Sequence, residues 1–283
     1  MSDNAQPLLG KESAVMSLKE SIPYQAARKL FYALKDWDST KKKIQYYRAV
    51  RPYRNLCTGQ KCFVVGNGPS LKAEDLTRIH QLGIASFGCN RINLIFDQTA
   101  WRPTYYFISD AKIMKNYSDQ VDGVPETHRF FPSRFQNEGK KGIYYREIQF
   151  DYEHEGRFST DAAKGIYPAA SVTTEMIQFA YYMGFSEIYL IGVDFSYSVT
   201  QKVDSKTYSY QGENNYFIPG YLKPGEVADM PNINANLLGF KAARDTIEAN
   251  GRSIYNATRG GKLEVFERVD LDALLKKWEA EKK

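Results

Sequence analysis

The sequence predicts an α/β protein with a single Rossmann-like, mostly parallel β-sheet that carries helices on both faces. Short apolar runs begin at Lys61, Ile84 and Glu187, and each ends in glycine or in polar residues. Such runs are typical of buried parallel strands that reach their turns. A stretch with helical periodicity separates the first two runs, and a strand, a helix and a strand at this spacing form a βαβ unit. The sequence also predicts an N-terminal helical extension and a lid.

Two amphipathic stretches, over residues 17–37 and 39–53, follow a polar start and indicate helices. We assign residues 1–55 to an N-terminal helical extension and residues 56–283 to the Rossmann-like catalytic domain. Basic residues alternate with apolar residues in the extension. This pattern suits packing against a partner subunit in a homo-oligomer, or peripheral binding to an acidic membrane surface.

The first half of the predicted core contains strands over residues 61–66, 84–90 and 105–110, with a helix over residues 72–82. Residues 112–168 lack a clear periodicity because aromatic residues and glycines are scattered among charges. We expect this segment to form short strands and loops that cover the sheet.

The second half of the core is more regular. A helix is predicted over residues 171–183, followed by the clearest strand, over residues 187–194. Residues 196–231 are rich in Ser, Tyr, Asn, Gly and Pro, and a loop of this length indicates an active-site lid. A helix over residues 233–250 should end at Gly251 in a left-handed cap. A strand over residues 253–256 and a helix from Leu271 complete the prediction.

Composition favours a cytoplasmic enzyme. The chain has 283 residues, of which 43% are hydrophobic, enough for one large core. Its three cysteines cannot all pair, which favours a reducing compartment. We find no signal peptide and no run near the ~18 apolar residues of a membrane span. The net charge of +5 is spread out, so we expect no nucleic-acid partner. If the extension binds lipid, the enzyme would be peripheral to the inner face of the membrane.

The loop after the first predicted strand indicates a phosphate or nucleotide site. It contains Gly66, Asn67, Gly68, Pro69 and Ser70. The glycines permit a tight turn and the close approach of a ligand, and Ser70 can cap the next helix. Unpaired N–H groups and the helix dipole there would favour an anion. The alternative is a tight turn with a well-capped helix.

Polar residues follow three other predicted strands. Because the carboxyl ends of parallel strands meet at one edge of a sheet, we expect these residues to share a site. They are Cys89, Asn90 and Arg91 after the second strand, Ser109 and Asp110 after the third, and Asp194, Ser196 and Tyr197 after the strand over residues 187–194.

Three runs carry a family resemblance: Val-Val-Gly-Asn-Gly-Pro-Ser-Leu from Val64, Phe-Gly-Cys-Asn-Arg from Phe87, and Gly-Phe-Ser-Glu-Ile-Tyr-Leu-Ile-Gly-Val-Asp-Phe from Gly184. They resemble the sialyltransferases of glycosyltransferase family 42. They are equally similar to the related proteins described as like 6-hydroxymethylpterin pyrophosphokinase. The resemblance covers about residues 61–110, 165–200 and 232–260.

The resemblance to family 42 implies a GT-A-like Rossmann variant that needs no metal and no cofactor. It also implies a nucleotide-activated sugar donor, CMP-linked in that family, and a glycan or lipid-linked acceptor. By position, Asn67 and Gly68 would contact the donor's phosphate or ribose, and Asn90 would lie beside the sugar. Ser171 would fall near the nucleotide at the start of a helix. Tyr197 and either Tyr208 or Tyr210, of which we select Tyr210, would stabilise the departing phosphate, since neutral donors must do so without a metal.

The sequence departs from that family at its general base, which is a histidine in the lid. The three histidines, His80, His128 and His154, all precede residue 196. Candidate bases are therefore Asp110, Asp194, Asp204 and Glu213. Neither a D-x-D pair nor a zinc-site spacing is present. Two further functions remain open: a pyrophosphokinase that acts on a pterin with ATP and magnesium, and a nucleotide-binding relative without catalysis.

Overall fold

The structure is a computed structural model that describes residues 26–27, 40–122, 124 and 128–282. Residues 41–283 form one compact unit. The helix that we predict over residues 17–37 lies outside the described residues except for 26 and 27. The division of the chain near residue 55 stays a prediction. Within the described residues, no helix is long and apolar enough to cross a bilayer.

The core is an eight-stranded sheet in the order β11-β10-β6-β1-β2-β3-β4-β5, and every pair of neighbouring strands is parallel. The predicted Rossmann-like α/β fold is therefore confirmed. The strands are β1 (Lys61–Val65), β2 (Ala85–Cys89), β3 (Tyr105–Phe107), β4 (His128–Pro132), β5 (Ile143–Tyr145), β6 (Glu187–Ile191), β10 (Ser253–Asn256) and β11 (Glu267–Arg268).

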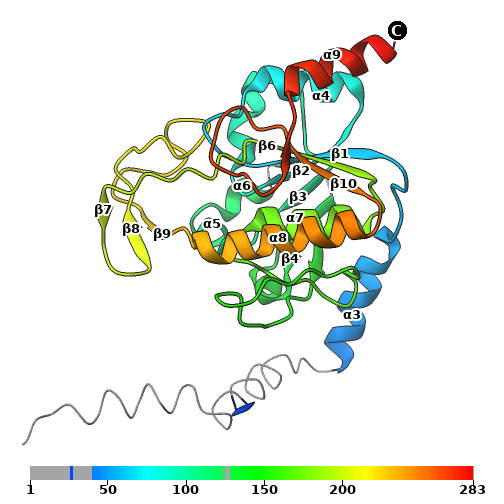
Figure 1. Cartoon of the computed structure of the whole chain (residues 1–283). Coiled ribbons are helices and arrows are strands. Elements are labelled where there is room, and N and C mark those ends of the chain that lie inside the picture. Colours follow the sequence, from blue (N-terminus) through cyan, green and yellow to red (C-terminus); the bar gives the residue numbers. More distant parts are fainter. Residues whose placement is uncertain (1–25, 28–39, 123, 125–127, 283) are drawn as a thin grey trace, which may run out of the picture. The chain divides into compact units, whose positions relative to one another are not determined.

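Helices cover both faces of the sheet, as predicted (Figure 1). Alternate residues of β1 point to opposite sides, so Val64 belongs to one buried apolar cluster and Phe63 to the other. The cluster around Val64 includes residues of α7 (Val172–Tyr182) and α8 (Ile233–Ala249). The cluster around Phe63 includes residues of α4 (Ala73–Leu82) and α9 (Leu271–Glu281).

The segment over residues 112–168 corrects one prediction. Its strands β4 and β5 do not cover the sheet but extend it, because β4 pairs with β3 and β5 pairs with β4. The apolar side chains of Phe130 and Tyr145 supply the burial that stabilises these short strands. The described part of this segment also contains α5 (Ala111–Asn116), the end of α6 (Ser118–Asp122) and the 3-10 helix η3 (Ser133–Glu138).

The strand order places a topological switch point between β1 and β6. From β1 the chain builds the sheet outward through β2 to β5, and it then returns through α7 to place β6 on the other side of β1. In open α/β sheets, ligands bind at the carboxyl ends of the strands that flank such a point. The loops that begin at Gly66 and Gly192 therefore lie at the expected position of a site.

The remaining elements flank this core. The predicted lid contains a small antiparallel sheet in the order β7-β8-β9, drawn in yellow tones in Figure 1. Its strands are β7 (Gln201–Lys202), β8 (Thr207–Ser209) and β9 (Val227–Asp229). The other elements are α3 (Thr40–Val50) and the 3-10 helices η1 (Arg51–Tyr53) and η2 (Ile92–Gln98).

Candidate functional site

Two loops interlock at the switch point. The N–H groups of Gly66 and Gly68 donate hydrogen bonds of 2.8 Å to the carbonyls of Ile191 and Gly192, respectively. A Cβ at Gly66 would lie 2.4 Å from the Gly192 oxygen, and a Cβ at Gly68 would lie 2.0 Å from Oδ2 of Asp194. The two glycines are thus required for the close contact between these loops.

These contacts correct the prediction that the glycine loop presents unpaired N–H groups to an anion. The N–H of Ser70 is also paired, at 3.4 Å from Oδ2 of Asp194, and its hydroxyl donates to the same oxygen at 2.8 Å. Ser70 does not cap α4, because that helix starts at Ala73 and its N-cap is Lys72. Pro69 lies in the turn between the loop and α4. The loop binds its neighbour through groups that we expected to bind phosphate.

Asn67 and Asn90 offer acceptors that the protein leaves unused. Nδ2 of Asn67 donates to the Cys89 carbonyl at 3.2 Å, and this bond ties the loop after β1 to the end of β2. Asn90 follows β2 in the left-handed region at φ 50°, and its carbonyl accepts from the Tyr106 hydroxyl at 2.5 Å. The Oδ1 atoms of both asparagines are buried and have no hydrogen-bond partner among the described residues. Buried polar atoms are almost always paired, so these two oxygens are free to accept hydrogen bonds from a ligand.

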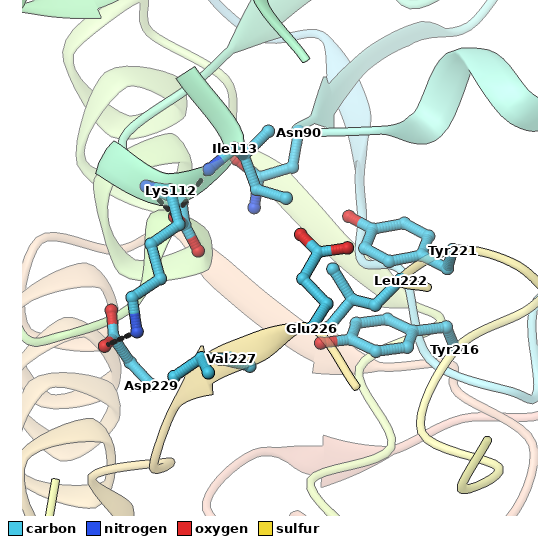
Figure 2. A pocket seen from close by; sticks show the side chains of 11 residues that line it. Asn90, Lys112, Ile113, Tyr216, Tyr221, Leu222, Glu226, Val227 and Asp229 are labelled. Carbon is cyan, nitrogen blue, oxygen red and sulfur yellow. Dashed lines mark hydrogen bonds and ion pairs between the residues drawn. The ribbon is translucent and has the colours of Figure 1, made fainter. Parts of the chain in front are cut away.

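A cavity of about 90 Å³ lies between β2, α5 and the lid (Figure 2). Asn90 and Asp110 line it, together with Lys112, Ile113, Tyr216, Tyr221, Leu222, Glu226, Val227, Ala228 and Asp229. Oδ1 of Asp110 accepts hydrogen bonds from the N–H groups of Lys112 and Ile113, at 2.7 and 2.9 Å, and caps α5. Burial raises the pKa of Asp110, although these two hydrogen bonds oppose the shift.

Arg91 holds the lid rather than facing the cavity. Its guanidinium donates to the carbonyls of Gly220 and Tyr221 and to Oε1 of Gln120. Its Cζ also lies 3.7 Å from the ring centre of Tyr117. With its side chain buried, Arg91 joins the end of β2 to the lid.

Other contacts close the lid over the carboxyl edge of the sheet. The N–H of Phe217 donates to the Asn67 carbonyl at 3.0 Å. Lys112 of α5 forms an ion pair with Asp229 of β9 at 2.5 Å, visible in Figure 2. The cavity that remains is well below the roughly 300–1,000 Å³ of small-molecule sites. This cavity is therefore too small for a ligand of the size of a nucleotide.

The tyrosines predicted to stabilise the leaving phosphate differ in exposure and in partners. Tyr197 lies at the surface with 47% of its side chain exposed, and it interacts electrostatically with Tyr208 and Asp194. Tyr210 is buried, and its hydroxyl donates to the Glu213 carbonyl at 3.1 Å. Of the two lid tyrosines, Tyr208 is the one with an electrostatic interaction with Tyr197.

The candidate bases differ in the direction in which their surroundings shift the carboxyl pKa. Burial raises the pKa of Asp194, against the hydrogen bonds from Ser70. Burial would also raise the pKa of Glu213, but hydrogen bonds from Thr200 and Gln211 lower it to about 2. Backbone hydrogen bonds, first from Lys206, lower the pKa of Asp204. Asp110 and Asp194 therefore have carboxyl pKa values shifted in the direction that suits a base near neutral pH.

Glu175 is a buried acidic residue that the sequence analysis missed. It lies in the first turn of α7, four residues after the N-cap Ser171, whose hydroxyl oxygen accepts from the Thr173 N–H. Its buried carboxyl accepts hydrogen bonds from the hydroxyls of Tyr145 and Ser109, so Ser109 is engaged here. Burial, followed by the nearby Glu147, raises the pKa of Glu175 to about 8. A lone acidic residue in an otherwise apolar helical stretch is the signal that could have identified it.

The histidines of the outer strands and loops lie apart from these groups. Nδ1 of His128 is 2.8 Å from the Tyr53 hydroxyl, and Nδ1 of His154 is 3.1 Å from the Asp151 carboxylate. In the described part of the chain, no group of three or more His, Cys, Asp or Glu side chains is placed to hold a metal ion.

A family model described as 6-hydroxymethylpterin diphosphokinase MptE-like matches residues 38–200, more than half of the 283-residue chain. No curated protein matches the chain.

Solved structures similar to this chain include the MAf glycosyltransferase from Magnetospirillum magneticum AMB-1, at 17% identity and a TM-score of 0.48. The match covers 93% of this chain and 45% of the other, so this chain spans less than half of that protein. The sialyltransferase CstII from Campylobacter jejuni, in complex with cytidine-5'-monophosphate, matches at 16% identity and a TM-score of 0.43, covering 75% of this chain and 85% of the other. A mammalian sialyltransferase matches at 12% identity and a TM-score of 0.37, covering 84% and 86%.

Proposed function

The chain belongs to the 6-hydroxymethylpterin diphosphokinase MptE-like family, and we propose that it is a transferase for a nucleotide-activated substrate. In this proposal the substrate binds at the carboxyl edge of the sheet, beneath the lid. The reaction is transfer of a sugar from a nucleotide-linked donor, CMP-linked in the first instance, to a glycan or lipid-linked acceptor, without a metal ion.

The two buried Oδ1 atoms of Asn67 and Asn90 are the observation that carries the proposal. They lie after the adjacent strands β1 and β2, and each lacks a hydrogen-bond donor among the described residues. Leaving such an oxygen unpaired costs about 1–3 kcal/mol, which a bound ligand would recover. Ribose and sugar hydroxyls, and the amino group of cytosine, are donors of the required kind. These asparagines thus favour recognition of the sugar and nucleoside rather than of the phosphate.

Asp110 is the proposed general base. It lines the same cavity as Asn90, and burial raises the pKa of its carboxyl toward the range in which a base is effective. The Asp110 carboxylate would take the proton of an acceptor hydroxyl as that oxygen bonds to the anomeric carbon of the donor. The bond between the anomeric carbon and the phosphate oxygen would break, and the nucleotide would leave with the bonding electrons.

Neutral hydroxyls would stabilise the leaving nucleotide. Tyr197 is exposed at the switch point, and Tyr208 is its neighbour in the lid. Hydrogen-bond donors that meet the developing charge lower the barrier without a metal. In this proposal Asp194 is a positioning residue, because its carboxylate is already bonded to Ser70.

The second candidate is diphosphate transfer from ATP to a pterin, and the family match favours it. This reaction uses magnesium, which carboxylate oxygens would have to bind. Three carboxyls, from Asp110, Glu226 and Asp229, line the cavity. However, Asp229 is paired with Lys112, and the Glu226 carboxylate accepts from Tyr117. These residues therefore do not form a set of free magnesium ligands.

A thermal-shift screen with cytidine, uridine, guanosine and adenosine nucleotides, each with magnesium or with a chelator, tests the proposal. A ligand that binds only the native state raises its melting temperature. We expect a pyrimidine nucleotide to stabilise the protein with chelator present, and Asn67→Ala with Asn90→Ala to remove the shift. Asn250→Ala, at the end of α8, is the matched control. Stabilisation by adenosine nucleotides only with magnesium would favour the second candidate, and a shift without turnover of any donor would indicate a nucleotide-binding relative.

A further inference from the structure

The charged residues of the segment over residues 40–54 are all basic. Its sequence, TKKKIQYYRAVRPYR, has no acidic residue and six basic ones: Lys41, Lys42, Lys43, Arg48, Arg51 and Arg54. Not all of these basic side chains are available to a partner, because Arg54 forms an ion pair of 2.6 Å with Asp161. Neither α3 nor η1 contains an acidic residue that could pair with the others.

This segment has one buried and one exposed face. Tyr46 and Val50 are buried against the compact unit. Counted from Ile44, Tyr47, Arg48 and Arg51 are at positions i+3, i+4 and i+7, so the four form a stripe on the other side. Ile44 is 45% exposed and Tyr47 is 37% exposed, while both arginines are also exposed. Large apolar side chains between basic ones are characteristic of helices that lie in the interface of a membrane.

The folded unit holds this face in place. The Tyr46 hydroxyl donates to Oε1 of Gln136 at 2.6 Å, which joins α3 to η3. Directly after η1, the N–H of Asn55 donates to the Tyr182 carbonyl at 3.1 Å, and that of Cys57 donates to Met183 at 2.8 Å. A membrane bound to the stripe would therefore bind the whole enzyme in one orientation.

We propose that the stripe of Ile44, Tyr47, Arg48 and Arg51 docks the protein onto an anionic lipid bilayer. The arginines supply the attraction to acidic headgroups, and Ile44 and Tyr47 insert at the level where headgroups meet acyl chains. A nucleic acid would use the charges but would gain little from Ile44, which favours lipid as the partner. This inference is independent of the proposed function.

Flotation of the full chain with vesicles tests the proposal. One vesicle is phosphatidylcholine alone, and the other is phosphatidylcholine mixed with phosphatidylglycerol. We expect binding only to the anionic vesicles. Each basic side chain near such a surface strengthens binding about fivefold. Arg48→Glu with Arg51→Glu should therefore weaken binding by at least about 25-fold. Ile44→Ser with Tyr47→Ser should weaken the binding that persists at high salt.

The matched control is Lys276→Glu with Lys277→Glu, which changes the net charge equally at exposed positions of α9. It should keep most of the binding, and unchanged melting temperatures would show that all variants fold. An equal loss of vesicle binding in this control would overturn the proposal, because binding would then depend on the net charge of the protein alone. It would also be overturned if the wild type ignored both vesicles, bound an oligonucleotide in preference to them, or used the stripe to form oligomers.

Discussion

The Ser70 hydroxyl donates a hydrogen bond of 2.8 Å to Oδ2 of Asp194, and this bond joins the loop after β1 to the loop after β6. It spans the switch point of the sheet. Asp194 is enclosed further by Gly261, where a Cβ would lie 2.6 Å from the Asp194 carbonyl oxygen. The carboxylate is therefore part of the framework that shapes the carboxyl edge.

Ser70→Ala should lower the free energy of unfolding by about 1–3 kcal/mol, because it leaves an oxygen of the buried Asp194 carboxylate without its hydroxyl donor. Urea denaturation would measure the change. Ser205→Ala, at an exposed position of the lid, should change stability by less than about 0.5 kcal/mol. Equal effects at the two serines would contradict a specific role for the Ser70 bond.

Gly68→Ala should destabilise the fold by about 1–3 kcal/mol, since its Cβ would overlap the Asp194 carboxylate and force the two loops apart. The double variant with Asp194→Ala is the informative control. Because the residues are in contact, the two effects should not add, and the double variant should lose less stability than the sum. Strict additivity in denaturation would show that the clash lies elsewhere.

Arg91→Lys should loosen the lid without unfolding the core. Lysine keeps the charge but loses the fork that reaches the Gly220 and Tyr221 carbonyls. Hydrogen bonds from a charged group contribute about 1.5–3 kcal/mol, so amide exchange over residues 210–228 should be at least about tenfold faster. Hydrogen–deuterium exchange with mass spectrometry would detect this. Arg102→Lys, whose guanidinium bonds the Thr99 and Trp101 carbonyls outside the lid, should leave the same peptides unchanged.

Glu175→Gln should alter the dependence of stability on pH. Burial raises the folded pKa of Glu175 to about 8, above its ordinary value of 4.5. The stabilising contribution of this group is thus complete below the lower value and is lost as the pH rises through the higher one. Between pH 4.5 and about 8, the free energy of unfolding of the wild type should fall by up to about 1.4 kcal/mol per pH unit relative to that of the glutamine variant. Urea denaturation at several pH values would measure the difference, and parallel curves would refute the assignment.

Asp110→Asn tests the proposed base separately from binding. Asparagine can still accept the hydrogen bonds that cap α5, but it cannot take a proton. Turnover of a nucleotide-sugar donor should fall by about 10²–10⁴-fold, while the thermal shift given by the nucleotide stays unchanged. If turnover persists, the base is another group, and Asp194→Asn is the next variant to assay.

The sequence analysis was most successful where local patterns determine structure. The strands around Val64, Phe87 and Leu190 are apolar runs with clear ends, so their parallel pairing and the meeting of their carboxyl ends followed directly. The short strands expected within residues 112–168 were misplaced, because no clear periodicity marks β4 and β5 and their stability comes from neighbours such as Phe107 and Phe179.

The partners of polar side chains could not be predicted in the same way. The position of Arg91 directly after a strand predicts a contact with a ligand. Its guanidinium instead donates to carbonyls of a lid loop that is distant in sequence. Glu175 in a first helical turn is usually a surface residue that complements the helix dipole. Its burial depends on Tyr145 and Ser109, which reach it only in the folded sheet. The unpaired oxygens of Asn67 and Asn90 are likewise visible only once their neighbours are known.

The strand order has a consequence for biosynthesis. A ribosome completes β1 early, and β2 is available almost at once as a partner for Cys62 to Val64. The other side of β1 pairs with Glu187 to Ile191, which are made far later. During that interval the central strand of the future sheet has an open apolar edge, the kind of surface that promotes aggregation of nascent chains. Efficient production of this protein should therefore depend on how well the cell shields incomplete chains that end before Ile191.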